Sequence, residues 1–130
     1  NVDFKSRKVI EETAMKAVIE NEINLGYEPQ DVSSQNLGCD ILSFDRTRNK
    51  HRFIEVKGKS FDKREVTVSK NEIICGLNKK EDYALAIVYV KGKSFKEPIY
   101  CWDPFDLMPS DDMISTNFDI KKLIKKSNGL

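Results

Sequence analysis

The sequence has few of the residues on which several familiar kinds of site depend. It contains one histidine, His51, so sites with several histidine ligands are excluded, and a catalytic triad would have to use this residue. The three cysteines, Cys39, Cys75 and Cys101, lie far apart and form no Cys-x-x-Cys pair, which disfavours structural zinc and a disulfide framework. Free, buried thiols in a reducing compartment, the cytoplasm, explain this spacing better.

Long apolar runs, low-complexity segments and an excess of one charge are also missing. No apolar stretch approaches the roughly 20 residues that a bilayer span needs, so no membrane partner is expected. The 22 basic and 21 acidic residues give a formal net charge of +1, which excludes a globally basic binder but allows a local basic patch. The first residues show neither an initiator methionine nor a signal-peptide pattern. We expect a single domain over residues 1–130, cut from a larger protein.

The apolar residues that are present recur with the periods of helices and strands. Helices are expected over residues 4–25, 69–77 and 114–126, and strands over 27–32, 39–45, 51–57, 83–90 and 98–102, with 64–68 extended. Gly26 ends the first helix, and Ser69 with Glu72 forms a capping box for the second. This order predicts an α/β fold, a three-layer-like sandwich in which helices flank a mixed central sheet of about five strands.

The apolar faces of the first and last helices are expected to point inward. In the first helix this face contains Val9, Ile10, Ala14, Ala17, Val18 and Ile23, and in the last helix Phe118, Ile120, Leu123 and Ile124. Glu11 flanks the face of the first helix, whereas Glu12 lies nearly opposite and is expected to be solvated. Tyr100 and Trp102 are expected to pack around the last strand.

Basic residues concentrate between Arg46 and Arg64. This stretch contains eight basic and two acidic residues, a local net charge of +6, and the rest of the chain is weakly acidic. The basic residues are Arg46, Arg48, Lys50, Arg52, Lys57, Lys59, Lys63 and Arg64. A basic hairpin on an acidic body is typical of a surface that contacts a nucleic-acid backbone. A hairpin that is merely solvated explains the charge equally well.

Two acids and a lysine on the expected hairpin form a group with a chemical use. Glu55 and Lys57 are two residues apart on a strand and share a face, and the hairpin brings Asp40 close to Glu55. Mg²⁺ takes oxygen ligands and usually one or two carboxylates, which Asp40 and Glu55 supply with the Val56 carbonyl. Lys57 then lies beside the water that attacks a phosphodiester. The alternative, an ordinary surface ion pair, is favoured by the spacing alone.

The residues around this group resemble a known family. Gly38–Asp45 and Arg52–Gly58 are similar to the core of the NO VEIN C-terminal-like domain, which is itself similar to the PD-(D/E)XK nuclease superfamily. Further matches, from Arg7 to Val90, include Glu11, Ala14-Met15, Gly26-Tyr27, Asp31–Ser33, Thr67, Ser69, Asn71-Glu72 and Asp82–Leu85. Cys39 stands where the superfamily has a nominal proline, a position that varies widely.

The resemblance implies a restriction-endonuclease-like core and a nuclease that depends on Mg²⁺ or Mn²⁺. Asp40, Glu55 and Lys57 take the catalytic positions, and Glu11 completes the acidic cluster and supports the metal. The implied substrate is DNA, with RNA left open, held by the basic stretch and by Asn71 at a helix N-terminus. Restriction-modification or defence is the implied context, with attached ATPase or helicase modules and a homodimer for paired cuts. The alternative is a nucleic-acid-binding or protein-interaction domain that does not cleave.

Overall fold

The computed structural model describes residues 4–128. The helices are α1 (Phe4–Asn24), α2 (Lys70–Lys79) and α3 (Ile120–Ser127), with 3₁₀ turns at η1 (Ser33–Gln35) and η2 (Lys80–Asp82). The strands are β1 (Glu28–Asp31), β2 (Ile41–Asp45), β3 (Lys50–Ser60), β4 (Glu65–Ser69), β5 (Tyr83–Lys91), β6 (Ser94–Phe95), β7 (Ile99–Trp102) and β8 (Ser115–Asp119). Within residues 4–128, no helix combines the length and the apolar character that spanning a bilayer requires.

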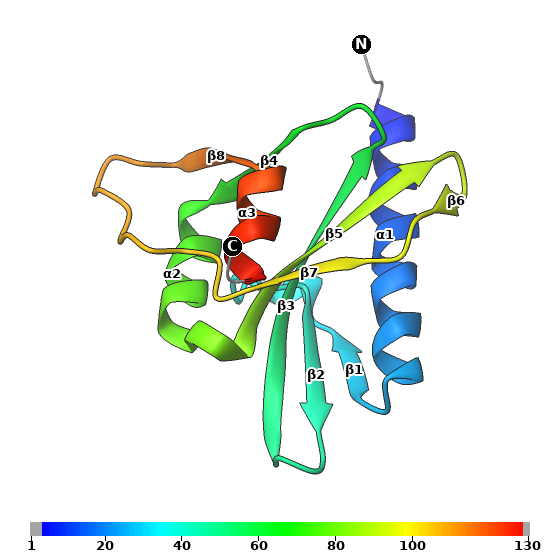
Figure 1. The fold of residues 1–130 in the computed structure, drawn as a ribbon, viewed down its shortest axis with the longest axis horizontal. Helices are drawn as coiled ribbons and strands as arrows, with labels where there is room; N and C mark the ends of the chain where they lie inside the picture. Colours follow the sequence, from blue (N-terminus) through cyan, green and yellow to red (C-terminus); the bar gives the residue numbers. More distant parts are fainter. Residues whose placement is uncertain (1–3, 129–130) are drawn as a thin grey trace.

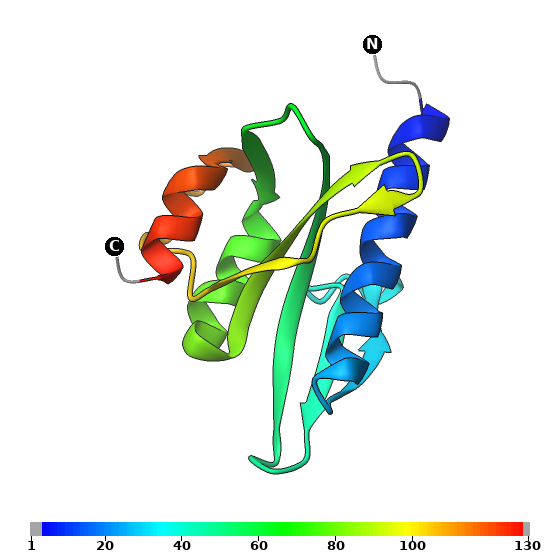
Figure 2. The ribbon, with the colours of Figure 1, turned by 45° about the vertical axis from the view of Figure 1, so that its right-hand side comes forward.

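One curled, mixed sheet organises the molecule (Figure 1). Its strand order is β1-β2-β3-β5-β6, and β7 also pairs with β5. β1, β2 and β3 are antiparallel neighbours, β3 and β5 are parallel, and β6 and β7 are antiparallel to β5. α1 covers one face, while α2, α3 and a separate β4–β8 ribbon cover the other (Figures 1 and 2). The predicted α/β sandwich with a mixed sheet flanked by helices is confirmed.

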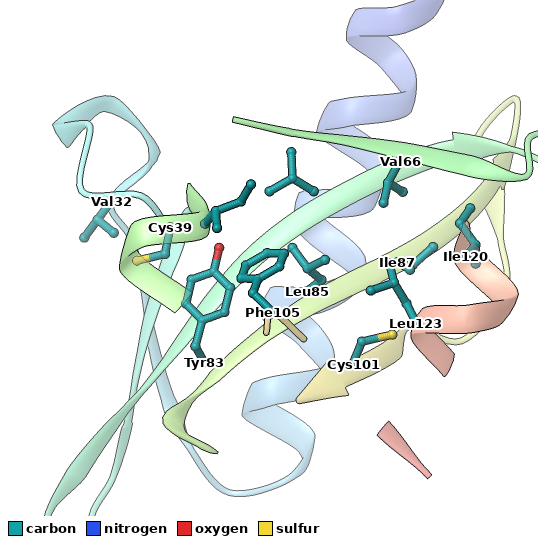
Figure 3. Close-up of a cluster of buried hydrophobic side chains, with 12 residues drawn as sticks. Val32, Cys39, Val66, Tyr83, Leu85, Ile87, Cys101, Phe105, Ile120 and Leu123 are labelled. Carbon is teal, nitrogen blue, oxygen red and sulfur yellow. The ribbon is translucent and has the colours of Figure 1, made fainter. Parts of the chain in front are cut away.

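The central strand β5 separates two apolar clusters because its side chains alternate between the faces. Leu85 and Ile87 join the cluster under α2 and α3, which Figure 3 shows. Ala86 and Val88 join the cluster under α1. Both clusters are fully buried at β5, as the apolar run predicts for a strand that is covered on both faces.

The helix α1 lies directly on β3 at Gly58. A Cβ built on Gly58 would come within 2.9 Å of both the Ala14 Cβ and the Ile10 carbonyl oxygen. A side chain at this position would therefore push the helix away from the strand. This close approach holds the N-terminal half of α1 against the part of β3 that contains the candidate site.

The predicted last helix is partly wrong. Residues 115–119 form β8, which pairs with β4 in the register Val66 to Phe118, and α3 begins only at Ile120. Asp119 caps this helix, because its side chain accepts from the Lys122 N–H at 3.1 Å. Phe118 does point inward, as predicted, but from a strand.

The predicted face of α1 is also partly wrong. Val9 is 40% exposed and Ile23 is 56% exposed, whereas Glu22 is fully buried. The apolar period therefore identifies the middle of the contact, around Ala14 and Val18, but not its C-terminal end. At that end the buried side chain is the Glu22 carboxylate. Its partner, Arg52, is thirty residues away in sequence and comes close to it only in the folded chain.

Candidate active site

The candidate site lies at the start of β2, where the neighbouring strand β3 continues beyond it. Ile41, the first residue of β2, pairs with Ile54, and β3 then runs on to Ser60 without β2 beside it. The Asp40 N–H donates to the Ile54 carbonyl at 2.9 Å, and the Val56 N–H donates to Asp40 Oδ2 at 2.8 Å. The Asp40 side chain thus accepts the hydrogen bond that a neighbouring strand would otherwise accept from Val56. This bond fixes the Asp40 carboxylate at the open edge of β3.

A cleft of about 710 Å³ opens at this edge. Its walls come from α1, η1, β3 and β4. The predicted residues Glu11, Asp40, Glu55, Val56 and Lys57 all line it, together with Lys59 from the basic stretch. The fold therefore brings the predicted catalytic and metal residues to one cavity.

Glu55 and Lys57 are not an exposed surface pair. Lys57 Nζ lies 3.3 Å from Glu55 Oε2, and the side chains are only 15% and 7% exposed for Lys57 and Glu55. A second carboxylate is closer still, because Lys57 Nζ donates to Glu72 Oε1 at 2.9 Å. This burial removes the simplest structural alternative for the Glu-x-Lys spacing.

Glu72 is a site residue that the sequence analysis explained only as a helix cap. The capping box exists, since Glu72 N–H donates to Ser69 Oγ at 3.2 Å and Ser69 N–H donates to Glu72 Oε1 at 3.0 Å. The same Oε1 atom accepts from Lys57. The resemblance of Asn71-Glu72 to the family was a signal of a role in the site. The capping box already explained Glu72, so its contact with Lys57 was not predicted.

Burial and like charge shift the carboxyl groups of the cleft toward their protonated forms. Burial, and then the negative charge of Asp40, raise the pKa of Glu55 to about 10. Burial also raises the pKa of Asp40, although the Val56 N–H and a hydrogen bond from the Glu55 carboxyl oppose the change. At neutral pH these shifts favour a protonated Glu55, whose carboxyl group is hydrogen-bonded with both Asp40 and Glu72.

Lys57 remains a cation in the same surroundings. Burial alone would lower its pKa, but the charges of Glu55 and Glu72 outweigh burial and raise the pKa of Lys57. Glu72 behaves in the reciprocal way: burial acts to raise its pKa, and Lys57 with the Ser69 N–H lowers it. The Lys57–Glu72 pair is thus charged on both sides.

The donor set fits one divalent cation with several water ligands better than a protein cage. Asp40 and Glu55 are neighbouring buried carboxyl groups, and the negative charge of Asp40 adds to burial in raising the pKa of Glu55. Two carboxylates suffice for Mg²⁺. Among residues 4–128, no group of three or more His, Cys, Asp or Glu side chains converges as a metal site.

Glu11 stands apart from this pair. It is exposed on α1 and, within the described residues, makes no hydrogen bond or ion pair, although it lines the same cleft. Glu12 is exposed as predicted, and it also lines the cleft. The structure therefore places Glu11 across the cavity from Asp40 and Glu55 without joining it to them.

The basic residues at the tip of the β2–β3 hairpin are paired with acids. Arg46 binds Glu28 through two hydrogen bonds of 2.8 and 2.9 Å. Arg48 and Lys50 approach Asp82 to 3.7 and 3.0 Å. The tip extends away from α1 and α2 (Figure 1). Much of the local positive charge is therefore balanced and lies outside the cleft.

Arg52 has a structural contact that explains its presence. It binds the buried Glu22 through hydrogen bonds of 2.8 and 3.0 Å. The centre of its guanidinium group lies 4.1 Å from the Tyr27 ring centroid and 4.6 Å from that of Trp102. Tyr100 Oη also donates to Glu22 at 2.7 Å. The pair joins α1, β3 and β7.

The remaining basic residues of the stretch lie nearer to the cleft. Lys59 is half-buried and lines the cavity, and Lys63 and Arg64 are exposed in the turn after β3. Asn71, at the N-terminus of α2, makes long hydrogen bonds of 3.4 and 3.5 Å to Asn36, in the loop before Asp40. Of the predicted nucleic-acid-binding residues, Lys59 therefore lines the cleft itself, and Asn71 directly precedes the site residue Glu72.

The fold and the cleft define an α/β domain with a buried acidic and lysine cluster at the open edge of a strand. Residues 10–101 match the family model described as Protein NO VEIN, C-terminal, and the chain belongs to this family. The matched segment contains Asp40, Glu55, Lys57 and Glu72. Searches of curated proteins and of solved structures found no match.

Proposed function

We propose that the domain is a metal-dependent nuclease of the PD-(D/E)XK type that hydrolyses phosphodiester bonds in nucleic acid, with DNA as the preferred substrate. The observation that carries the proposal is the buried cluster of Asp40, Glu55 and Lys57 in an open cleft. Buried carboxylates beside a lysine are costly to fold. A site that binds a cation and a phosphate gives that cost a function.

Each residue has a separate task in this proposal. Asp40 and Glu55 would hold Mg²⁺ or Mn²⁺, with the Val56 carbonyl next to them. When bound, the ion lowers the pKa of a water and neutralises charge on the phosphoryl oxygens. Lys57, kept as an ammonium by Glu72, would donate to a phosphate oxygen and stabilise the charge that develops there, while the attacking water gives its proton to solvent. Glu72 is a positioning residue, since it orients the Lys57 side chain from α2.

The wider setting follows from the family resemblance and is part of the same proposal. A restriction or defence system would supply ATPase or helicase modules that deliver the substrate to this domain. Cuts in both strands would require a second copy of the domain. Both suggestions rest on analogy with other nucleases rather than on residues of this cleft.

A cleavage assay tests the proposal directly. The purified chain should cut DNA in Mg²⁺ or Mn²⁺ and not in EDTA, and Asp40→Asn, Glu55→Gln and Lys57→Ala should each reduce cleavage about a hundredfold or more. Glu20→Gln, an exposed acid on α1, serves as the matched control and should cleave normally. Glu72→Gln should cause a smaller loss, because it removes only the orientation of Lys57.

The alternative is a domain that binds nucleic acid or a protein without cleaving. It is favoured by the absence of a three-carboxylate group among the described residues. Wild-type protein that binds DNA but never cuts it, or cleavage that survives the triple substitution of Asp40, Glu55 and Lys57, would establish the alternative. Affinity for DNA that falls steeply with salt is expected under both functions and does not distinguish them.

A further inference from the structure

An exposed aromatic residue lies two positions beyond Lys59, which lines the cleft, and has no part in the proposed chemistry. Phe61 follows directly after β3, four residues beyond Lys57, a distance of about 13 Å along an extended chain. Its side chain is 47% exposed. Its ring meets the half-buried Tyr89 edge-on, with 6.5 Å between ring centroids. Tyr89 is itself fixed, because its hydroxyl donates to the Lys63 carbonyl at 3.3 Å.

One lysine covers a face of this ring, and two more lie close in sequence. Lys96 Nζ lies over the Phe61 ring, 4.8 Å from its centroid. Lys59 precedes Phe61 by two residues on β3, and Lys63 follows it by two residues in the turn. Within residues 4–128, none of these three lysines forms an ion pair with a carboxylate, which distinguishes them from the paired residues of the hairpin tip.

The positive charges near Phe61 repel one another. Burial, and then the charges of Lys57 and Lys63, lower the pKa of Lys59. Asp62 is a nearby acid, and its carboxylate accepts from Ser60 Oγ at 2.9 Å. The three lysines outnumber Asp62 and Glu97, the residue after Lys96, and leave a net positive surface, which a bound polyanion would neutralise.

We propose that Phe61, supported by Tyr89 and flanked by Lys59, Lys63 and Lys96, is a stacking platform for an unpaired nucleotide on the far side of Lys59 from the scissile phosphate. A base stacks on the face of the Phe61 ring that Lys96 does not cover, and the lysines bind the adjacent phosphates. The bases of an intact duplex are stacked inside it and cannot reach the ring. The platform therefore favours single-stranded or frayed nucleic acid, and its position along the substrate rests on the proposed function.

Fluorescence anisotropy with a labelled oligothymidylate in EDTA tests this platform without any cleavage. Phe61→Ala should weaken binding of the single strand by about tenfold or more, and Phe61→Trp should restore it. Phe95→Ala is the matched control, since Phe95 is a phenylalanine of equal exposure, 45%, in β6, and it should bind as the wild type does. A duplex of the same length should lose less than about twofold with Phe61→Ala.

The outcomes separate this proposal from the nuclease proposal. Equal affinities of Phe61→Ala and Phe95→Ala, parallel losses for single strand and duplex, or no binding by the wild type would each overturn the platform. Binding that depends on Phe61 in a protein that never cleaves would support the platform and refute the nuclease. Cleavage by a protein whose affinity for the single strand is unchanged by Phe61→Ala would support the nuclease and refute the platform.

Discussion

Glu55 is the residue whose protonation most affects the free protein. Its pKa is about 10 in the folded state, against roughly 4.3 in an unfolded chain. The folded state therefore keeps a proton that the unfolded state loses, and the stability associated with it is present at low pH and lost as pH rises between these values. We predict that, in EDTA, the free energy of unfolding falls from pH 6 to pH 9 by at most about 1.4 kcal/mol per pH unit.

Thermal unfolding of Glu55→Gln checks this prediction. The variant has no proton to lose, so its stability should depend less on pH than that of the wild type, and it should be the more stable protein at pH 9. Burial raises the pKa of Asp40 and adds to the same slope, whereas the lowered pKa of Glu72 acts at more acidic pH. Identical slopes for wild type and Glu55→Gln would show that Glu55 ionises freely in the cleft.

At the scale of elements, the Glu22–Arg52 pair joins α1 to the sheet. Glu22 is fully buried and Arg52 is 15% exposed. Arg52→Ala would leave a buried carboxylate without its partner, and we predict a loss of about 3–5 kcal/mol in the free energy of unfolding. Chemical denaturation of Arg52→Ala, Glu22→Gln and the double variant measures the coupling, which should be large.

The chain provides a control for this prediction in Arg46 and Glu28. That pair has similar hydrogen-bond lengths, 2.8 and 2.9 Å, but its side chains are 75% and 51% exposed. Arg46→Ala should therefore change the stability little. Equal effects of Arg46→Ala and Arg52→Ala would mean that burial does not determine the strength of these pairs.

The elements also show where sequence patterns stop being informative. β5 and α2 were predictable because an apolar run and a capping box are local signals. β8 was not, because residues 115–119 extend only through pairing with β4, whose register no local pattern contains. The strand β3 was predicted too short for the same reason, since its last residues pair with β5.

The candidate site divides in the same way. Asp40, Glu55 and Lys57 meet in one cleft, as the hairpin and the two-residue spacing predict. Glu72 joins them only because the crossover from β3 to β5 places the start of α2 above β3. Arg52 was counted with a nucleic-acid surface because its partner Glu22 is thirty residues away, and a charge count cannot pair them.

At the scale of the whole molecule, near-neutral net charge conceals a cleft that is short of positive charge. Five acids line it, Glu11, Glu12, Asp31, Asp40 and Glu55, against three lysines, Lys16, Lys57 and Lys59. We predict that Mn²⁺ at about a hundred times its dissociation constant stabilises the folded chain by about 2.7 kcal/mol. The cation must displace the Glu55 proton, so its affinity should rise with pH, by up to about tenfold per unit.

Calorimetric titration and thermal shifts measure this linkage without any substrate. Asp40→Asn and Glu55→Gln should each abolish the Mn²⁺-dependent stabilisation, because each removes a carboxylate ligand. Lys57→Ala should retain it or strengthen it, since the variant loses a cation from the cleft but no ligand. Stabilisation that persists in Asp40→Asn, or Mn²⁺ affinity that is independent of pH, would place the ion elsewhere and leave Asp40 and Glu55 without a metal. Loss of the Mn²⁺-dependent stabilisation in Asp40→Asn, together with its retention in Lys57→Ala, would therefore show that the cation binds at the carboxylates of this cleft.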